Sequence, residues 1–217
     1  MTARSRTPTR RKAGSRGVPR AVREPQILEA AGRLFAARGY HAASMEEIAA
    51  QAGVTKPLVY AYFGSKEDLY VAYIERSGIE LLDRMRRASD PSSPPGERLR
   101  AGSLEFLRFV EERRHGWQIL HAEATTRGGP LAKEVASLRE GVAQMIKRLL
   151  METLPDAPVS DEATAVVDGV AHAVVGAGES LANWWLGQPD LPPERAVDLL
   201  VAFAQAGMEQ ARYHLTA

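Results

Sequence analysis

The chain has 217 residues, of which 45% are hydrophobic and 25% are charged, as is ordinary for a folded protein of one or two domains. It contains no cysteine, which excludes disulfide bonds and thiolate metal sites, and its formal net charge of +1 means that any attraction to nucleic acid must come from a local patch. Because we find neither a signal segment nor an uninterrupted apolar stretch long enough to span a bilayer, we expect a cytoplasmic protein without a membrane partner.

Residues 1–22 are predicted to form a disordered basic arm. The segment is rich in arginine and has no acidic residue, and it contains too few apolar residues to form a core. Two interpretations are open. The arm is either a solvated tail without a role or a segment that contacts DNA phosphates or the minor groove.

The first helix is expected to begin near Pro25 and to end at Gly39. Proline fits a first helical turn, where its missing N–H leaves no bond unmade, and glycine is typical just after a last turn. Apolar residues recur at helical spacing between these ends, at Ile27, Leu28, Ala31, Leu34 and Phe35. This helix is predicted to support the two that follow.

Helix-capping residues are concentrated in residues 44–68. Ser44 followed by Glu47 is a capping box, and Ser65 followed by Asp68 is a weaker one. Between them, Thr55 is expected to cap a third helix.

The helices that begin at residues 44 and 55 are short and are joined by a turn that contains Gly53, a residue suited to the left-handed conformation. The buried positions predicted for them are Met45, Ile48, Ala49, Ala52, Val59 and Phe63. Two short helices around such a turn form a helix-turn-helix, whose second helix enters the major groove of DNA.

The same residues carry a family resemblance. The run GVTKPLVYAYFGSKEDL resembles the hallmark of TetR-family regulators, and the preceding ILEAAGRLFAARGYHAASMEEIAAQA resembles that family's first two helices. The resemblance implies an all-α fold. An N-terminal three-helix helix-turn-helix domain, residues 23–70, is joined by a long fourth helix to a larger helical ligand-binding and dimerisation domain, residues 71–217.

Double-stranded operator DNA is the partner that this resemblance implies. The candidate DNA-binding residues are Ser44, Thr55, Lys56, Pro57, Leu58, Tyr60, Ala61, Tyr62 and Lys66. Pro57, Leu58 and Ala61 depart from the family pattern and leave the base-reading surface poor in hydrogen-bond donors. Contact with thymine methyl groups and between Lys56 and guanine is what these residue types allow.

The fourth helix is expected to cover residues 65–88, with an apolar stripe of Leu69, Ala72, Tyr73, Leu82 and Met85. A proline- and serine-rich linker, residues 89–96, follows it. Beyond the linker we predict further helices. They are one that ends near residues 115–116, one over residues 117–125, one over residues 131–149, one over residues 161–186 and one over residues 194–214.

The last two of these helices are predicted to form a homodimer interface. The helix over residues 161–186 has a broad face of Ala163, Val167, Val170, Val174, Ala177, Leu181 and Trp184, with Gly169, Gly176 and Gly178 among them. Mid-helix glycines cost up to about 1 kcal/mol each against alanine, so close approach of another helix is the expected compensation. Two helices from each chain would form a four-helix interface. Alternatively, both face the core of one chain. The family resemblance implies dimerisation through the same two helices.

A polar stripe of Asp168, His172, Glu179 and Asn183 lies on the other side of this helix. It meets either water or a ligand cavity, and the residues alone leave both interpretations open. The candidate pocket residues are Phe106, Trp117, His121, Met145, His172, Glu179 and Asn183.

No catalytic motif, cofactor motif or metal-ligand spacing is found in the sequence. This absence favours a sequence-specific transcriptional regulator over an enzyme, and the family resemblance implies a repressor that an unknown small-molecule effector releases from its operator. One alternative is a helix-turn-helix protein without small-molecule control. A more remote one is a helical enzyme that uses the pocket.

Overall fold

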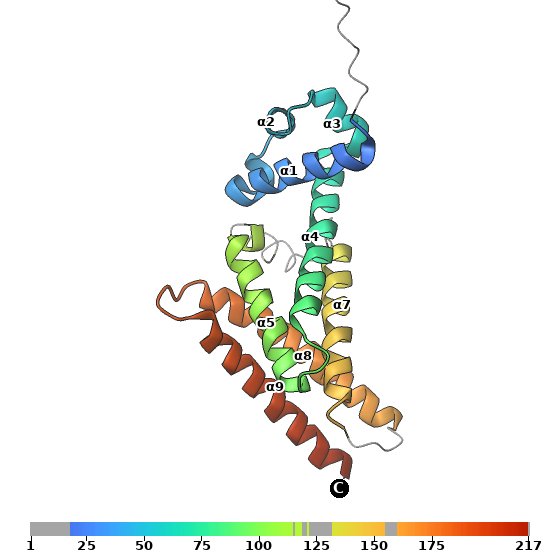
Figure 1. Cartoon of the computed structure of the whole chain (residues 1–217), viewed down its shortest axis with the longest axis vertical. Helices are drawn as coiled ribbons and strands as arrows, with labels where there is room; N and C mark the ends of the chain where they lie inside the picture. Colours follow the sequence, from blue (N-terminus) through green and yellow to red (C-terminus); the bar gives the residue numbers. More distant parts are fainter. Residues whose placement is uncertain (1–17, 115, 119–120, 122–131, 155–159, 217) are drawn as a thin grey trace, which may run out of the picture.

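The computed structural model describes residues 18–114, 116–118, 121, 132–154 and 160–216, and these residues form helices and turns without a strand. The predicted all-α fold is therefore confirmed. The helices, in chain order, are α1 (Arg20–Ala42), α2 (Met45–Gln51), α3 (Lys56–Phe63), α4 (Lys66–Ala88), α5 (Pro95–Glu112), α7 (Ala132–Met151), α8 (Asp161–Trp185) and α9 (Pro193–Thr216). Figure 1 shows α1–α3 grouped at one end of the molecule and α5 and α7–α9 at the other, with α4 running between them.

The N-terminal helices share a small core. Ile27 of α1, Ile48 of α2, Val59 of α3 and Leu69 of α4 are fully buried against one another's helices. Burial of these apolar side chains, more than the intrinsic stability of α2 or α3, holds the short helices in place, because isolated helices of this length are unstable in water. The predicted three-helix arrangement is present.

Helix α1 is longer than the sequence suggested. It begins at Arg20, so residues 20–22 belong to a helix and not to the predicted disordered arm, while residues 1–17 of that arm lie outside the described residues. Gly39 has a φ of 78°, as expected of a left-handed terminating residue. One more helical turn follows it and ends at Ala42, beyond the predicted end.

The predicted caps differ in outcome. The Ser44 hydroxyl accepts a hydrogen bond from the Glu47 backbone, the Glu47 carboxylate accepts one from the Ser44 backbone, and the Ser65 hydroxyl accepts one from the Asp68 backbone. Thr55 occupies the N-cap position of α3 but makes no side-chain cap bond, which corrects the prediction. Gly53 has the expected left-handed conformation, with φ of 65°.

Helix α4 contributes to both ends of the molecule. Its first turns bury Leu69, Tyr70 and Ile74 in the N-terminal core, whereas Leu81 and Met85 pack with Phe109 of α5 in the C-terminal part. The predicted stripe was therefore only partly correct, because Ala72, Tyr73 and Leu82 are partly exposed. At 1.5 Å per residue the helix is about 35 Å long, which lets it reach both cores.

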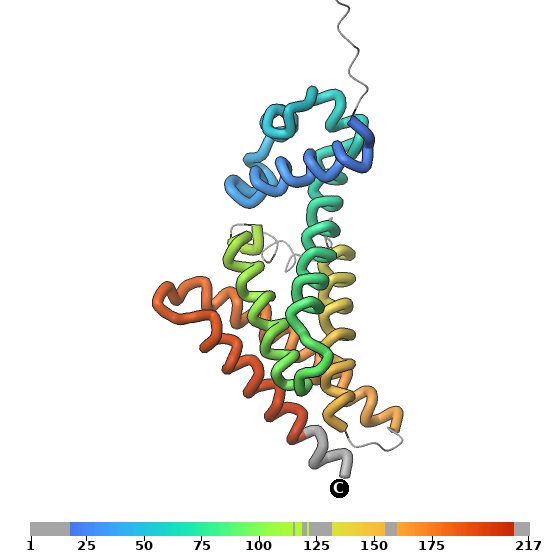
Figure 2. The backbone as a smooth tube through the Cα atoms, viewed as in Figure 1, coloured from blue at the N-terminus to red at the C-terminus, as the bar shows by residue number. Residues whose placement is uncertain are grey.

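The C-terminal core lies between α5, α7, α8 and α9 (Figure 2). Its buried stripe on α8 consists of Ala163, Val167, Ala171, Val174, Gly178, Ala182 and Trp185. The predicted face shares Ala163, Val167, Val174 and Gly178 with this stripe, whereas Val170, Ala177 and Leu181 are partly exposed and Trp184 is 48% exposed. Helix α5 ends at Glu112, earlier than predicted, and most of the helix predicted over residues 117–125 lies outside the described residues.

Helix α8 is long and apolar enough to cross a membrane by length and composition, with a mean hydropathy of 1.2 in its most apolar window. No stretch was expected from the sequence to meet that test. However, one side of α8 packs in the C-terminal core, where Val167 and Ala171 are fully buried. A helix that is apolar on most of its surface is also typical of a buried helix in a folded domain.

We predict that Ser44→Ala lowers the free energy of unfolding by about 1 kcal/mol, because the capping box satisfies backbone groups at the start of α2. Urea denaturation measures this change. Thr55→Ala is the matched control, since Thr55 sits at the same position of α3 without a side-chain cap bond. An equal loss in both variants would mean that the capping box contributes nothing beyond the residue type.

Candidate functional site

The candidate DNA-binding residues cluster around the start of α2, the whole of α3 and the start of α4 (Figure 1). Thr55, Pro57, Tyr60 and Ala61 are exposed, and Ser44, Lys56, Leu58, Tyr62 and Lys66 are partly buried. Among them, Lys56, Tyr60, Tyr62 and Lys66 have long polar side chains. The exposed surface of α3 is thus mainly apolar and small, as the sequence predicts.

Local ion pairs and ring contacts order the cations on this surface. Lys56 pairs with Glu46 of α2, and this hydrogen bond raises the pKa of the Lys56 ammonium. The Lys56 ammonium also lies 5.9 Å from the ring centre of Tyr60. Lys66 donates to the backbone carbonyl of His41 at 3.2 Å. The start of α4 is therefore tied to the end of α1.

Arg20 is a further cation that the structure brings to this region. Its guanidinium donates to the backbone carbonyl of Tyr62 at 3.3 Å and lies 5.0 Å from the centre of the Tyr62 ring. The sequence analysis missed it because Arg20 was assigned to the disordered arm. The helical pattern of α1 does not reveal the extra turn, since residues 20–24 include no strongly apolar residue other than Val22.

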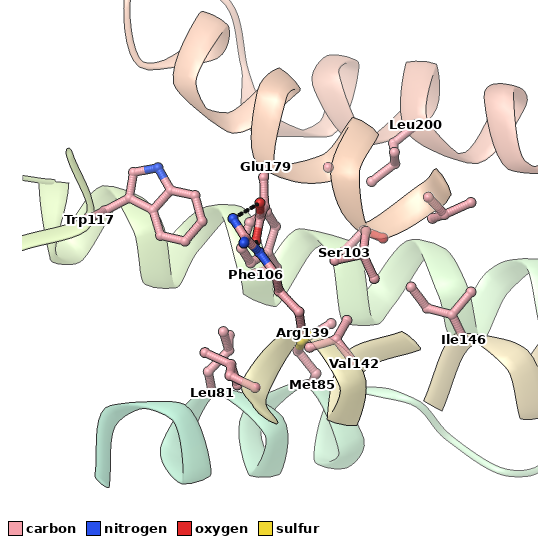
Figure 3. Close-up of a pocket in the computed structure, with 14 residues that line it drawn as sticks. Leu81, Met85, Ser103, Phe106, Trp117, Arg139, Val142, Ile146, Glu179 and Leu200 are labelled. Carbon is pink, nitrogen blue, oxygen red and sulfur yellow. Dashed lines mark hydrogen bonds and ion pairs between the residues drawn. The ribbon is translucent and has the colours of Figure 1, made fainter. Parts of the chain in front are cut away.

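A cavity lies between α4, α5, α7, α8 and α9 (Figure 3). Figure 1 shows these helices meeting in the C-terminal part of the molecule, away from α2 and α3. It has about 510 Å³ of empty space, part of which is open to solvent. The apolar side chains of its wall are Leu81, Met85, Phe106, Leu138, Val142, Ile146, Val174, Val175 and Leu200. A largely apolar wall with few polar groups is typical of small-molecule sites.

One ion pair stands inside this apolar wall. Arg139 of α7 donates from Nε to Oε1 of Glu179 at 2.8 Å and from Nη2 to Oε2 at 2.7 Å, a bidentate geometry visible in Figure 3. The hydrogen bond to Glu179 raises the pKa of the Arg139 guanidinium. The pair joins α7 to α8 across the cavity and is electrically neutral as a unit.

Of the predicted pocket residues, Phe106, Trp117 and Glu179 line the cavity. Asn183 lies behind Trp117 and accepts a hydrogen bond from its indole N–H at 3.0 Å. His121 stacks on the same indole, with ring centres 6.0 Å apart. Asn183 and His121 therefore contact the indole of a cavity-lining residue but do not line the cavity themselves.

The rest of the predicted polar stripe lies elsewhere. Asp168 accepts from Lys147 at 2.8 Å, and His172 lies 3.3 Å from a Glu140 carboxylate oxygen, on the half-exposed surface between α7 and α8. The carbonyl of Asp168, with a smaller contribution from Glu140, raises the pKa of His172. His172 is not part of the cavity wall, and neither is Met145, which packs beside Leu81, Met85 and Phe109. The stripe is therefore divided between solvent and cavity.

Arg139 was missed by the sequence analysis. It follows Leu138 on a helix whose apolar positions suggested a plain core face, and a single arginine next to such a position usually points to solvent. The available signal was Glu179, which is a candidate pocket residue in the sequence, because a carboxylate that lines a pocket requires a partner. Sequence spacing alone does not identify that partner on another helix.

Comparison with known proteins assigns the chain to a family. Residues 27–73 match the model described as bacterial regulatory proteins of the tetR family, and residues 95–207 match the tetracyclin repressor-like C-terminal domain. The chain belongs to the TetR family. It is therefore a DNA-binding transcriptional regulator with a helix-turn-helix, and not an enzyme, and TetR-family regulators bind operator DNA and typically act as dimers.

Similar TetR-family proteins differ in the direction of regulation. The chain is 31% identical to the HTH-type transcriptional activator FasR of Mycolicibacterium smegmatis, over 88% of this chain and 85% of FasR. It is 35% identical to the HTH-type transcriptional repressor SCO4008 of Streptomyces coelicolor, over 56% of this chain and 68% of that protein. A crystal structure of a TetR-like regulator from Rhodococcus sp. RHA1 is 35% identical and superposes with a TM-score of 0.67, covering 88% of this chain and 98% of that one.

We predict that Lys66→Ala weakens binding to all DNA sequences alike and lowers the slope of log affinity against log salt by about 1, as expected for one lost phosphate contact. Fluorescence anisotropy across a salt series measures both quantities. Arg148→Ala is the charge-matched control, since Arg148 is exposed near the far end of α7. An unchanged slope for Lys66→Ala, or an equal change in the control, would contradict a phosphate contact at this position.

Proposed function

We propose that the protein is a homodimeric repressor whose affinity for double-stranded operator DNA falls when a small molecule occupies the cavity beside Arg139. The observation that carries this proposal is the placement of Leu81 and Met85. Both residues line the cavity, and both belong to α4, whose first turns are buried in the core of the helix-turn-helix. A ligand that displaces α4 at one end therefore moves the DNA-binding helices at the other.

In this proposal residues 23–70 bind DNA and residues 71–217 bind the ligand and the second protomer, within the cytoplasm as the sequence predicts. Lys56, Tyr60 and Lys66 supply the donors for phosphates and bases, with Ser44, Thr55 and Tyr62 beside them. Pro57, Leu58 and Ala61 supply the apolar contacts. The 40% exposure of Tyr60 supports its role, because a hydroxyl on a rigid, exposed ring is suited to a phosphate.

The dimer interface is proposed to be the outer face of α8 and α9. Trp184 of α8 is 48% exposed, and Leu199 and Phe203, one turn apart on α9, are 55% and 52% exposed, which favours a partner that covers these large apolar side chains. Gly169 and Gly176 lie on the same side of α8, and a Cβ added to either would meet no atom of this chain. The fold of one protomer therefore gives no reason for these glycines, whereas close approach of a partner's helix does.

We predict that Phe203→Asp converts the dimer to a monomer, because a carboxylate would be buried without a partner in the interface. Light scattering coupled to size-exclusion chromatography measures the mass. Ile79→Asp is the matched control, since Ile79 is 70% exposed on α4 and away from α8 and α9. A dimeric Phe203→Asp protein, or loss of the dimer in the control alone, would place the interface elsewhere.

Ligand control is tested by a thermal-shift screen of small amphipathic compounds, followed by operator affinity measurements with the compounds that stabilise the protein. The operator is first selected from genomic fragments that the protein retains. A ligand of the cavity is expected to lower operator affinity by about 5- to 150-fold, the usual size of coupling between two sites. A compound that raises the melting temperature and leaves operator affinity unchanged would favour DNA binding without small-molecule control.

Transcription in vitro from the same operator then separates repression from activation.

A further inference from the structure

We infer that the cavity selects an uncharged amphipathic ligand whose hydrogen-bond-accepting oxygen reaches Arg139, in preference to a free carboxylate or an amine. The inference rests on the proposed function, because it specifies the chemistry of the ligand at the same cavity. It is carried by the geometry of the Arg139–Glu179 pair within the apolar wall.

The pair is the charged element of the wall. Among the described residues that line the cavity, Arg139 and Glu179 carry charge, Ser103 and the Trp117 indole are polar, and the others are apolar or glycine. A ligand that fills this space must therefore be apolar over most of its surface. Its polar group is directed to the end of the cavity where Arg139 and Glu179 meet (Figure 3).

Arg139 keeps donors for such a ligand. The bidentate pair uses Nε and Nη2, and among the described residues no acceptor is bonded to Nη1. A guanidinium has five N–H donors, so an incoming carbonyl oxygen can accept from Nη1 while both bonds to Glu179 stay intact. Uncharged oxygen acceptors, such as those of esters, ketones or amides, meet this requirement.

A charged ligand adds an unpaired charge beside the neutral Arg139–Glu179 pair. A carboxylate beside an intact pair would leave one net negative charge in a largely apolar space, and to avoid this it must displace Glu179 from Arg139. An amine has the converse problem with the Arg139 guanidinium. In both cases one charge beside the apolar wall ends without its partner, where the Glu179 side chain is 17% exposed and the Arg139 side chain is 37% exposed, and this is unfavourable. The neutral pair thus rejects ions of either sign and accepts a neutral oxygen.

The test is isothermal titration calorimetry of the full chain at neutral pH with methyl octanoate, octanoate and octylamine, which share one alkyl chain length and differ in the charge of the head group. We expect methyl octanoate to bind tighter than either ion by roughly tenfold or more. Tryptophan fluorescence follows the same titrations, because Trp117 lines the cavity, and Trp117→Phe identifies the signal that arises there.

Charge variants sharpen the test. Glu179→Gln leaves Arg139 without its counterion, so octanoate is expected to become the tightest ligand. Arg139→Gln leaves Glu179 unpaired and is expected to favour octylamine. The matched control is Arg113→Gln, which removes another arginine–carboxylate pair outside this cavity, in which Arg113 Nη2 donates to both carboxylate oxygens of Glu80. It is expected to leave the order of the three ligands unchanged. Melting temperatures establish that each variant is folded, and the wild-type order decides the inference even if a variant does not fold.

Three results would overturn the inference. They are tighter binding of octanoate or octylamine than of methyl octanoate to the wild-type chain, no binding of any of the three, or an unchanged order in the folded charge variants. Failure of the proposed function gives a different result. In that case methyl octanoate binds in the predicted order but does not alter the affinity for operator DNA.

Discussion

Helix α4 contributes buried side chains to two hydrophobic cores, and the rest of the structure depends on this constraint. Leu69, Tyr70 and Ile74 are buried with α1–α3, while Leu81 and Met85 are buried beside α5 and line the cavity. A continuous helix transmits displacement along its axis because its backbone hydrogen bonds resist bending. Under the proposed function, packing at its two ends converts a change in cavity shape into a change in the orientation of α3.

Individual cations are positioned by neighbouring groups, so the protein can bind DNA although its formal net charge is only +1. On the surface proposed to face DNA, Lys56 is paired with Glu46, and Lys66 donates to a backbone carbonyl of α1. Under the proposed DNA contacts, these bonds hold two long, flexible side chains in place before DNA binds, so less conformational entropy is lost on binding. In the cavity, an ion pair likewise positions Arg139 in a largely apolar wall, with Glu179 as its counterion.

Much of the N-terminal half could be predicted from the sequence because its signals are local. Ser44 with Glu47, Gly39 and Gly53 act through their own side chains or φ angles. The structure confirms the capping box and the left-handed Gly53, and Gly39 interrupts α1 with a kink after which one more turn follows. The phase of α8 could not be predicted, because alanine, valine and glycine cover most of its surface and give no contrast between interior and exterior. The Arg139–Glu179 pair could not be predicted from the sequence either, because it depends on how α7 and α8 pack and not on either segment alone.

In the proposed mechanism, occupation of the cavity changes the separation of the two recognition helices in the dimer. Because the chain has no cysteine, a single Gln51→Cys substitution at the exposed end of α2 gives one spin label per protomer. Pulsed electron paramagnetic resonance then measures the distance between the labels in the dimer, with operator DNA and with a cavity ligand whose binding calorimetry has established. On DNA, we predict a narrow distribution that matches recognition helices about 34 Å apart, or a multiple of that spacing. With the ligand and without DNA, we predict a shifted distribution. A distribution that the bound ligand leaves unchanged would contradict the claim.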